Sequence, residues 1–294
     1  MRNCIRRENT TAREGCRKKI EKDGRRIHWG GGSYVMTTRD NLVKSVMKAL
    51  EILELLNREA ELGISEMADR LGWDKSTVYR LVATLKEKGY VNQNPANQKY
   101  ANSMKLFEMG NSVVERLGFR RKCQPYLEEL AMRTHETVNL AIQDGSEIIY
   151  IDKIESMATI KVDLAIGKRL PMYCTGLGKA ILAWLPEEEV DLLLQEEHFT
   201  AHTANTVTSL NELKKQLVQI RQKGYSLDDE EYVMGLKCVA SPVWNHQGKP
   251  VAAVSVAIPE YRYENGTDQA GYAGLVMEVA QKISRELGYQ PAGG

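Results

Sequence analysis

Residues 64–90, with the sequence ISEMADRLGWDKSTVYRLVATLKEKGY, contain two segments of helical apolar spacing separated by a turn. The apolar positions of the first segment are Met67, Ala68 and Leu71. Ser65 is the expected N-cap of this helix, because serine side chains accept hydrogen bonds from first-turn N–H groups. The segment Gly72-Trp73-Asp74 interrupts the pattern, since glycine permits φ > 0 and aspartate prefers turns. The stretch therefore predicts a helix-turn-helix.

The second segment has one apolar and one polar face. Its apolar positions, spaced i, i+3, i+4 and i+7, are Val78, Leu81, Val82 and Leu85. The polar face carries side-chain types that contact phosphates and base edges in protein–DNA complexes. We expect operator contacts from Lys75, Ser76, Thr77, Tyr79 and Arg80. The competing interpretation is an ordinary pair of packed helices with solvated charges.

Two short strands follow. Residues 90–93 and 99–101 flank the turn 94–98, and beside a recognition helix such a hairpin is a wing. We expect Lys99 in this wing to contact backbone phosphate. A preceding helix is expected over 41–57, with apolar positions Leu42, Val46, Ala49, Leu50, Leu53 and Leu56. These elements predict a winged helix-turn-helix domain over residues 37–103.

Length and composition exclude several classes of protein. The chain has 294 residues, 43% hydrophobic and 27% charged, which is typical of soluble globular proteins and long enough for two domains. No apolar run approaches the roughly 20 residues of a membrane span, and the basic N-terminus lacks the apolar core of a secretory signal. We therefore expect a cytoplasmic protein with no membrane partner. The five cysteines are scattered and never form a CxxC pair, so neither a disulfide framework nor a zinc knuckle is expected.

The first 36 residues differ from the rest. They carry ten Lys and Arg against four acids, with few apolar side chains and a run of three glycines at 30–32. This composition predicts a disordered basic leader over residues 1–36. It is either an arm that follows DNA phosphates or an over-long start, with translation beginning at Met36.

Residues 104–120 predict an amphipathic linker helix, whose apolar positions are Leu106, Met109, Val113 and Leu117. Such a stripe either pairs with its copy in a second chain or lies on the following domain. Beyond residue 121 the patterns are mixed. Helices are expected from Pro125 onward and at 178–184, 186–195 and 210–224, with strands at 237–244 and 250–258. Helices around an antiparallel sheet predict an α+β domain over 121–294.

Two features of this domain suggest a small-molecule site. On the strand at 251–258, Ala253, Ser255 and Ala257 share one face, which either leaves room for a ligand or admits close packing. At a helix start, the N–H groups of the segment Thr175-Gly176-Leu177-Gly178 either hold a carboxylate or form a simple turn. The acidic run 228–231 is either solvated or brings Asp228 to the pocket.

Other chemistries have weaker support. His198 and His202 have metal-ligand spacing without a third ligand nearby in sequence. Cys174 or Cys238 are candidate reactive thiols, yet no neighbouring His or Lys lowers the thiol pKa. The sequence contains no Ser-His-Asp order, phosphate-binding loop or dinucleotide fingerprint. A metal-responsive regulator and a thiol enzyme acting through Cys238 remain alternatives.

Several motifs, in order between Leu42 and Tyr289, resemble the IclR family of bacterial transcription regulators. They are Lys75-Ser76-Thr77-Val78-Tyr79-Arg80, Gly89-Tyr90-Val91, Lys105-Leu106-Phe107-Glu108-Met109-Gly110, Gly176-Leu177-Gly178-Lys179-Ala180, Gly224-Tyr225, Asp228-Asp229-Glu230-Glu231 and Gly235-Leu236-Lys237-Cys238. Residues 148–156 and 282–289 look most like the 2-keto-3-deoxygluconate-responsive members.

The resemblance implies a winged helix-turn-helix, a linker helix and a GAF-like effector domain, assembled as a homodimer or homotetramer on a double-stranded DNA operator. It also implies a small keto acid as effector, held by the backbone amides of Gly176 and Leu177 and by the side chains of Asp228, Cys238 and Ser255. Ala257 replaces a family serine, which puts glyoxylate or pyruvate in doubt as the effector. We thus expect a non-enzymatic repressor that needs no cofactor or metal.

Overall fold

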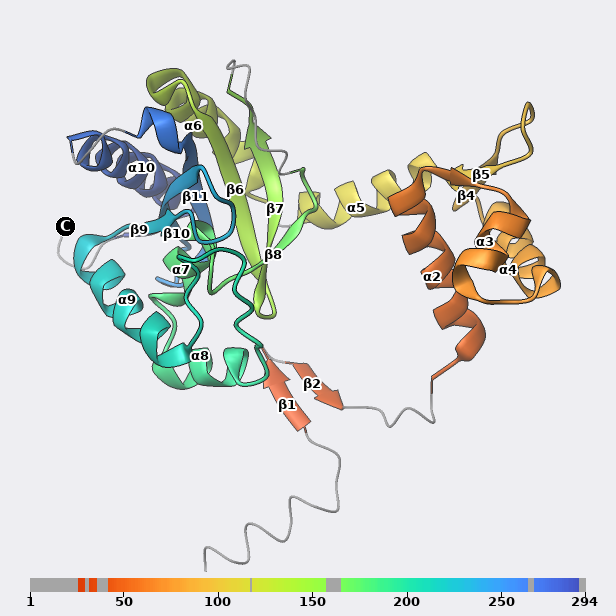
Figure 1. Ribbon diagram of the computed structural model, residues 1–294. Coiled ribbons are helices and arrows are strands. Elements are labelled where there is room, and N and C mark those ends of the chain that lie inside the picture. Colours follow the sequence, from red (N-terminus) through yellow and green to blue (C-terminus); the bar gives the residue numbers. More distant parts are fainter. Residues whose placement is uncertain are drawn as a thin grey trace, which may run out of the picture. The chain divides into compact units, whose positions relative to one another are not determined.

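The computed structural model describes residues 26–29, 32–35, 42–116, 118–156, 165–263 and 267–290 (Figure 1). The chain divides into two compact units, Met1–Gly110 and Asn111–Gly294, and each is described here by itself. No described helix combines the length and the apolar character needed to cross a membrane.

Part of the basic leader forms a hairpin. β1 (Arg26–Trp29) and β2 (Gly32–Val35) pair in antiparallel fashion. The prediction of disorder is therefore wrong for these two segments. The other leader residues lie outside the described part of the chain.

The first unit is a winged helix-turn-helix. Its helices are α2 (Lys44–Glu59), α3 (Ile64–Leu71) and α4 (Lys75–Glu87). The predicted wing is confirmed as β4 (Val91–Gln93) and β5 (Tyr100–Asn102), and a short strand that the sequence did not reveal, β3 (Glu61–Leu62), pairs with β5. The three helices enclose an apolar core that includes Ile52, Leu56, Met67, Val78, Val82 and Leu85.

Two local predictions in this unit are wrong. Ser65 is not the N-cap, because α3 begins at Ile64 with Gly63 as its N-cap, two residues before Ser65, and the Glu66 carboxylate accepts the Gly63 N–H at 2.7 Å. On α2, only the C-terminal half packs inward. The predicted core positions Leu42, Val46 and Leu50 are exposed.

α5 (Met104–Arg116) spans the boundary between the two units, which follows Gly110, and buries none of its residues. Its most exposed apolar side chains are Met104, Phe107, Met109 and Val113. A glycine in the left-handed region, Gly118 (φ +74°), separates α5 from α6 (Arg120–Thr134). The prediction that Pro125 opens this helix is wrong, because Pro125 lies inside it.

The second unit is built on a six-stranded antiparallel sheet of order β8-β7-β6-β11-β10-β9 (Figure 1), which confirms the predicted α+β class. The strands are β6 (Thr137–Asp144), β7 (Glu147–Ile154), β8 (Arg169–Pro171), β9 (Ser226–Asp229), β10 (Leu236–Trp244) and β11 (Pro250–Pro259). α6 and α10 (Thr267–Glu286) share a core with one face. The opposite face, called the effector face below, packs against α7 (Gly176–Leu182), α8 (Glu187–Leu194) and α9 (Leu210–Lys223).

The alternation predicted for the strand at 250–258 is confirmed. Val254, Val256 and Ile258 are buried in the core beneath α6 and α10. Ala253 packs on the effector face, so Ser255 and Ala257 share that face with it.

Helix α7 approaches the sheet so closely that two of its glycines are required. A Cβ on Gly178 would lie 2.3 Å from the Met172 Cα, and one on Gly176 would lie 3.1 Å from the Cys238 carbonyl oxygen. These contacts are with backbone, which cannot move aside as a flexible side chain can. The glycines therefore bring the N-terminus of α7 directly onto β10.

Gly178→Ala is expected to lower the free energy of unfolding by about 3 kcal/mol or more, because the new methyl group overlaps the backbone of Met172. Gly274→Ala is the matched control. Gly274 lies within α10 with nothing inside 4 Å of an added Cβ, so alanine there should raise stability by up to about 1 kcal/mol. Denaturant titration of both variants measures the two effects. Equal stability of the two variants would contradict this description of α7.

Candidate functional site

The predicted DNA-reading face lies on α4. Lys75, Ser76, Tyr79 and Arg80 are exposed, whereas Thr77 is partly covered. Tyr79 is 59% exposed, which is high for an aromatic residue that has no role at the surface. The opposite side of the helix packs in the core. The helix therefore presents a rigid polar and cationic surface that suits a duplex groove.

Lys99 is held within the protein. Its Nζ lies 2.9 Å from the Glu66 carboxylate on α3, an ion pair that fixes the wing against that helix. The Gly63 N–H and, secondly, Lys99 lower the pKa of Glu66, so this carboxylate is charged at neutral pH. At the wing tip, the Asn97 amide donates to Glu61 at 2.8 Å. A phosphate that contacts Lys99 must therefore compete with Glu66.

The residues predicted to hold an effector come together on the effector face. Asp228, Cys238 and Ala257 are direct neighbours on β9, β10 and β11. Ser255 lies two positions along β11 and is 1% exposed. Gly176 contacts β10 from above, at Cys238 and Ala240. The fold thus joins segments that are far apart in sequence, although their role as ligand contacts stays a prediction.

The N-terminus of α7 leaves two amides for a ligand. Thr175 caps the helix by accepting the Gly178 N–H at 3.2 Å, and its carbonyl accepts the Lys179 N–H at 2.9 Å. Gly176 and Leu177 belong to the same first turn, and no acceptor for their N–H groups is seen within the described ranges. These are the two amides that the sequence pattern indicates.

Lys179 is fully engaged inside the protein. Its side chain is 1% exposed, and its ammonium group contacts the Gln216 amide oxygen at 3.1 Å, the Leu227 carbonyl at 2.7 Å and the Glu231 carboxylate. The three donors of a lysine are thereby used. Lys179 therefore positions its neighbours and does not itself offer a charge to a ligand.

Asp228 is the titrating group of the site. Its side chain is buried, and its Oδ1 accepts the Glu231 N–H at 2.8 Å. Burial raises the pKa of Asp228 from 3.8 to about 7, against the opposing effect of Lys179. Asp228 therefore exchanges its proton near neutral pH, in line with the expectation that an Asp228 facing an anion must be protonated or contact a hydroxyl.

Tyr150 of β7 also belongs to this region and was missed in the sequence. Burial, followed by the nearby Cys238 and Asp228, raises its pKa well above 10. The apolar run Ile148-Ile149-Tyr150-Ile151, which predicts a strand over 147–152, was the available signal.

The thiol-enzyme alternative is not supported. Burial, followed by Asp228, raises the pKa of the Cys238 thiol well above 9, and burial raises that of Cys174 to about 12. Both thiols are therefore protonated at neutral pH, whereas the thiolate is the nucleophile.

The metal-site alternative is not supported either. The Nε2 of His202 lies 3.3 Å from the Tyr173 hydroxyl, and its ring packs 4.8 Å from that of Tyr232. No set of three potential metal ligands occurs among the residues that the structure describes. His202 thus belongs to an aromatic cluster.

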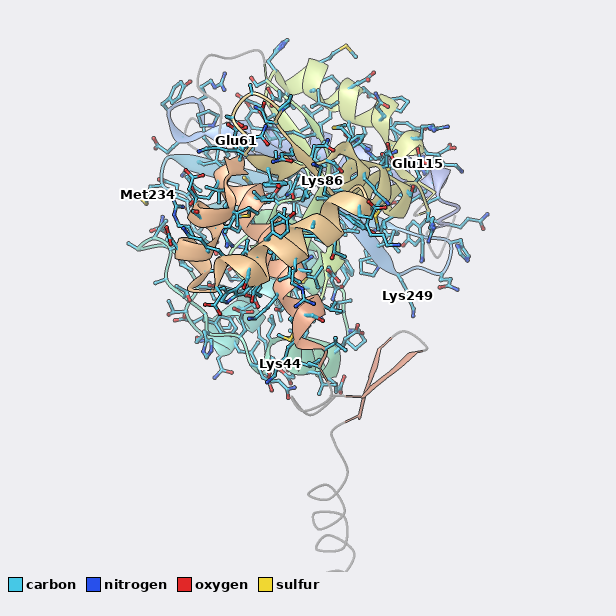
Figure 2. The ribbon with its side chains drawn as sticks, turned by 90° about the vertical axis from the view of Figure 1, so that its right-hand side faces the viewer. Lys44, Glu61, Lys86, Glu115, Met234 and Lys249 are labelled. Atoms are coloured by element: carbon cyan, nitrogen blue, oxygen red, sulfur yellow. The ribbon has the colours of Figure 1, made fainter. Side chains whose placement is uncertain are left out.

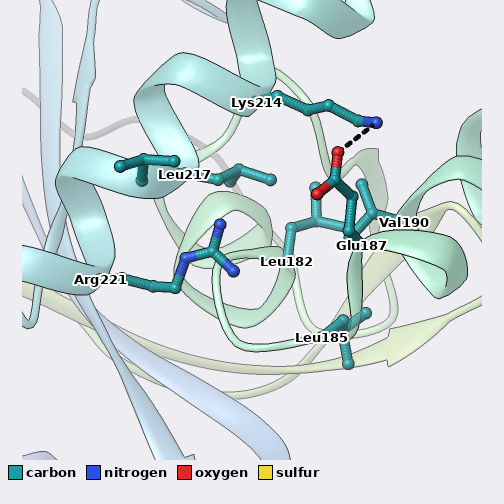
Figure 3. Close-up of a pocket in the computed structure, with 8 residues that line it drawn as sticks. Leu182, Leu185, Glu187, Val190, Lys214, Leu217 and Arg221 are labelled. Carbon is teal, nitrogen blue, oxygen red and sulfur yellow. Dashed lines mark hydrogen bonds and ion pairs between the residues drawn. The ribbon is translucent and has the colours of Figure 1, made fainter.

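A separate small pocket of about 60 Å³ lies between α7, α8 and α9 (Figure 3). Figure 3 shows the Lys214–Glu187 contact, 2.9 Å long, at one side of the pocket and the Arg221 side chain at the other. A space of this size holds a few water molecules and is too small for a sugar acid.

Asp228→Asn is expected to stabilise the protein at high pH. Because the folded-state pKa is raised, the unfolded chain loses the Asp228 proton first, and wild-type stability falls as pH rises from about 4 to 7. The asparagine keeps the Oδ1 acceptor without a charge. Its advantage should reach about 3–4 kcal/mol at pH 8 and vanish near pH 4, measured by denaturant titration. Asp229→Asn changes the exposed neighbour and should not raise stability at high pH. If both variants raise stability equally, the buried carboxylate of Asp228 is not the cause of the effect.

Comparison with known proteins identifies the family. Residues 45–95 match the IclR helix-turn-helix domain, and residues 111–285 match the family described as bacterial transcriptional regulator IclR C-terminal. The chain is 40% identical over 249 residues to the HTH-type transcriptional regulator XynR of Escherichia coli K12, covering 84% of this chain and 98% of the relative. It is 38% identical over 247 residues to KdgR of the same organism, covering 84% and 94%. The crystal structure of the Thermotoga maritima IclR aligns with a TM-score of 0.73 at 34% identity, over 84% of this chain and 99% of that one. The chain belongs to the IclR family of DNA-binding transcriptional regulators.

Proposed function

We propose that this protein is a non-enzymatic repressor whose operator affinity is controlled by a small keto acid. The observation that carries the proposal is the pairing of two surfaces in one chain. One is the exposed polar face of α4, and the other is the buried region where Gly176 lies against Cys238, whose strand neighbour is Asp228, with Ser255 on the next strand.

The DNA contacts in this proposal come from α4 and the wing. Ser76, Thr77, Tyr79 and Arg80 meet the operator with help from Lys75, and Lys99 meets backbone phosphate after leaving Glu66. In this proposal the winged domain extends over 37–103 and the effector domain over 121–294, and the linker segment 104–120 contains α5, which ends at Arg116. Because its target is DNA, the protein acts in the cytoplasm.

The effector is an acid, because its carboxylate can accept hydrogen bonds from the two amides and from a protonated Asp228. The α7 end of the site has no uncommitted lysine, so these groups must hold the acid. Backbone amides at a helix start hold a carboxylate well. The sequence likeness to 2-keto-3-deoxygluconate-responsive regulators supports that compound, and Ala257 in place of a family serine disfavours glyoxylate or pyruvate.

Exposed apolar side chains support a homodimer or homotetramer. They are Leu42 and Val43 just before α2, Val46, Met47 and Leu50 on α2, and Met104, Phe107, Met109 and Val113 on α5. Clusters of this kind are uncommon on monomeric proteins and mark interfaces. An effector changes DNA affinity only if it favours one arrangement of the paired heads, with α5 as the connection.

Arg80→Ala is expected to weaken operator binding about 10- to 100-fold, because one phosphate or base contact is worth about 1–3 kcal/mol. Fluorescence anisotropy with a duplex selected from random DNA measures this loss. Arg221→Ala, which removes an arginine from α9, should leave DNA affinity unchanged. Wild-type affinity in Arg80→Ala would refute the assignment of α4.

Acid binding is expected to depend on pH through Asp228. An anionic ligand binds the protonated carboxyl, so affinity should be constant below about pH 6 and fall up to tenfold per pH unit above about pH 7. Calorimetry in buffers of different ionisation enthalpy would detect proton uptake above pH 7. If the affinity of the wild type for the acid does not depend on pH, Asp228 does not face the ligand. The same conclusion follows if Asp228→Asn shows the same dependence of affinity on pH as the wild type.

A further inference from the structure

A row of side chains crosses the effector face beyond the five predicted residues. Lys153 of β7 pairs with Asn139 of β6, Asn139 pairs with Ser255 of β11, and Ser255 pairs with Ala240 of β10. Ala240 lies under the start of α7, where a Cβ on Gly176 would be 3.6 Å from the Ala240 Cβ. The row therefore runs across the effector face from β10, beneath the two α7 amides, to β7.

An irregularity in β7 turns Lys153 toward this face. The pairing shifts between Leu140, which faces Asp152, and Ala141, which faces Tyr150, so one extra residue is accommodated in β7. Asp152 contacts Arg120 of α6 at 3.1 Å, on the opposite side of the sheet. A bulge re-aims the side chains that follow it. Lys153, opposite Asn139, consequently shares the effector face with Tyr150.

Asn139 carries the clearest sign of a missing partner. It is 1% exposed, and its buried Oδ1 has no hydrogen-bond donor within the described part of the chain. A buried acceptor without a donor is costly, so such a group calls for a ligand or a water. The position next to Ser255 places this acceptor inside the row.

Lys153 supplies the complementary group. Its side chain is 8% exposed, and its ammonium group contacts Glu155 at 3.2 Å, an acid whose side chain is 52% exposed. Within the described ranges this is its one ion pair, which leaves further donors of the ammonium group for another acceptor. A buried lysine with a single solvated partner is uncommon unless it has a second role.

We propose that Asn139 and Lys153 form a second polar subsite beside the proposed effector contacts, which selects hydroxylated acids of five or six carbons. The subsite rests on the proposed function, since the carboxylate of the same ligand lies at Gly176 and Leu177. A hydroxyl group donates to the Asn139 Oδ1, and the Lys153 ammonium donates to the oxygen of a hydroxyl farther along the chain.

The chemistry excludes the shortest acids as full occupants. The aldehyde form of glyoxylate and the keto form of pyruvate carry acceptors only, so neither form provides a donor for the Asn139 carbonyl. Adjacent strands are about 4.8 Å apart, so β10 and β7 are separated by about 14 Å at the backbone. A two- or three-carbon acid at α7 cannot span toward Lys153, whereas a hydroxylated six-carbon chain can.

The test compares acids by calorimetry on the full-length protein. The probes are pyruvate, gluconate and 2-keto-3-deoxygluconate. We expect at least one hydroxylated acid to bind wild type tenfold or more tightly than pyruvate. Lys153→Met and Asn139→Leu should each weaken that acid about 10- to 100-fold, the loss of a hydrogen bond to a charged or buried group, while changing pyruvate affinity less than threefold.

Controls separate binding from folding and from DNA recognition. Lys249→Met removes an exposed lysine at the β10–β11 turn, labelled in Figure 2, and should bind every acid as wild type does. If Lys153→Met or Asn139→Leu has a lowered melting temperature, Lys153→Arg and Asn139→Ser replace them. Lys153→Arg should retain most of the affinity for the hydroxylated acid. Operator binding without acid should be unchanged in all variants, so a failure of DNA recognition is detected independently.

Three results would overturn the subsite. The first is a wild type that binds no hydroxylated acid more tightly than pyruvate. The second is wild-type affinity for the hydroxylated acids in the folded variants of Asn139 and Lys153. The third is an equal loss of affinity for pyruvate and for the longer acids in each variant, which would indicate general damage to the site.

Discussion

The buried ammonium group of Lys179 fixes the elements on which the candidate effector site depends. It joins α7 to α9 through Gln216, to β9 through Leu227 and to the following turn through Glu231. Removing one partner of such a buried pair usually costs several kcal/mol, so these groups stay together. The Glu231 N–H then holds the carboxyl of Asp228. A lysine with no uncommitted donor thus sets the position of the residue proposed to meet the ligand.

Local patterns predicted the recognition helix and the central strand well. The apolar spacing of α4 and the alternation of β11 depend on neighbours only a few residues apart, and in both cases one face is buried against a continuous core. The helix start at Gly176 was also readable, because its glycines are needed where backbone meets backbone.

Features set by distant partners could not be predicted. The acidic run at 228–231 looks solvated in sequence, yet Asp228 and Glu231 are buried because Lys179 and a backbone amide receive them. The start of α3 depends on the hydrogen bond from the Gly63 N–H to the Glu66 carboxylate. This bond forms in place of the predicted cap by Ser65.

The same limit applies to two neighbouring strands of the sheet, β6 and β7. Asn139 and Lys153 look like ordinary polar positions, because the shift in β7 that brings them to one face has no local signature. On α2, regular spacing predicted more packing than occurs, since spacing gives the direction of a side chain but not what covers it.

The ion pair between Lys99 and Glu66 has a consequence for the measured thermodynamics of DNA binding. The dependence of DNA affinity on salt concentration reports how many cations leave the DNA phosphates when positively charged side chains neutralise them. Lys99 is already neutralised by its own protein, so its transfer to a phosphate leaves Glu66 to gather a cation from solution. One cation is then released from the phosphate while another is taken up at the Glu66 carboxylate, so the net number of released cations does not change. The slope of affinity against salt will therefore be smaller than the number of phosphates that the wing and recognition helix touch.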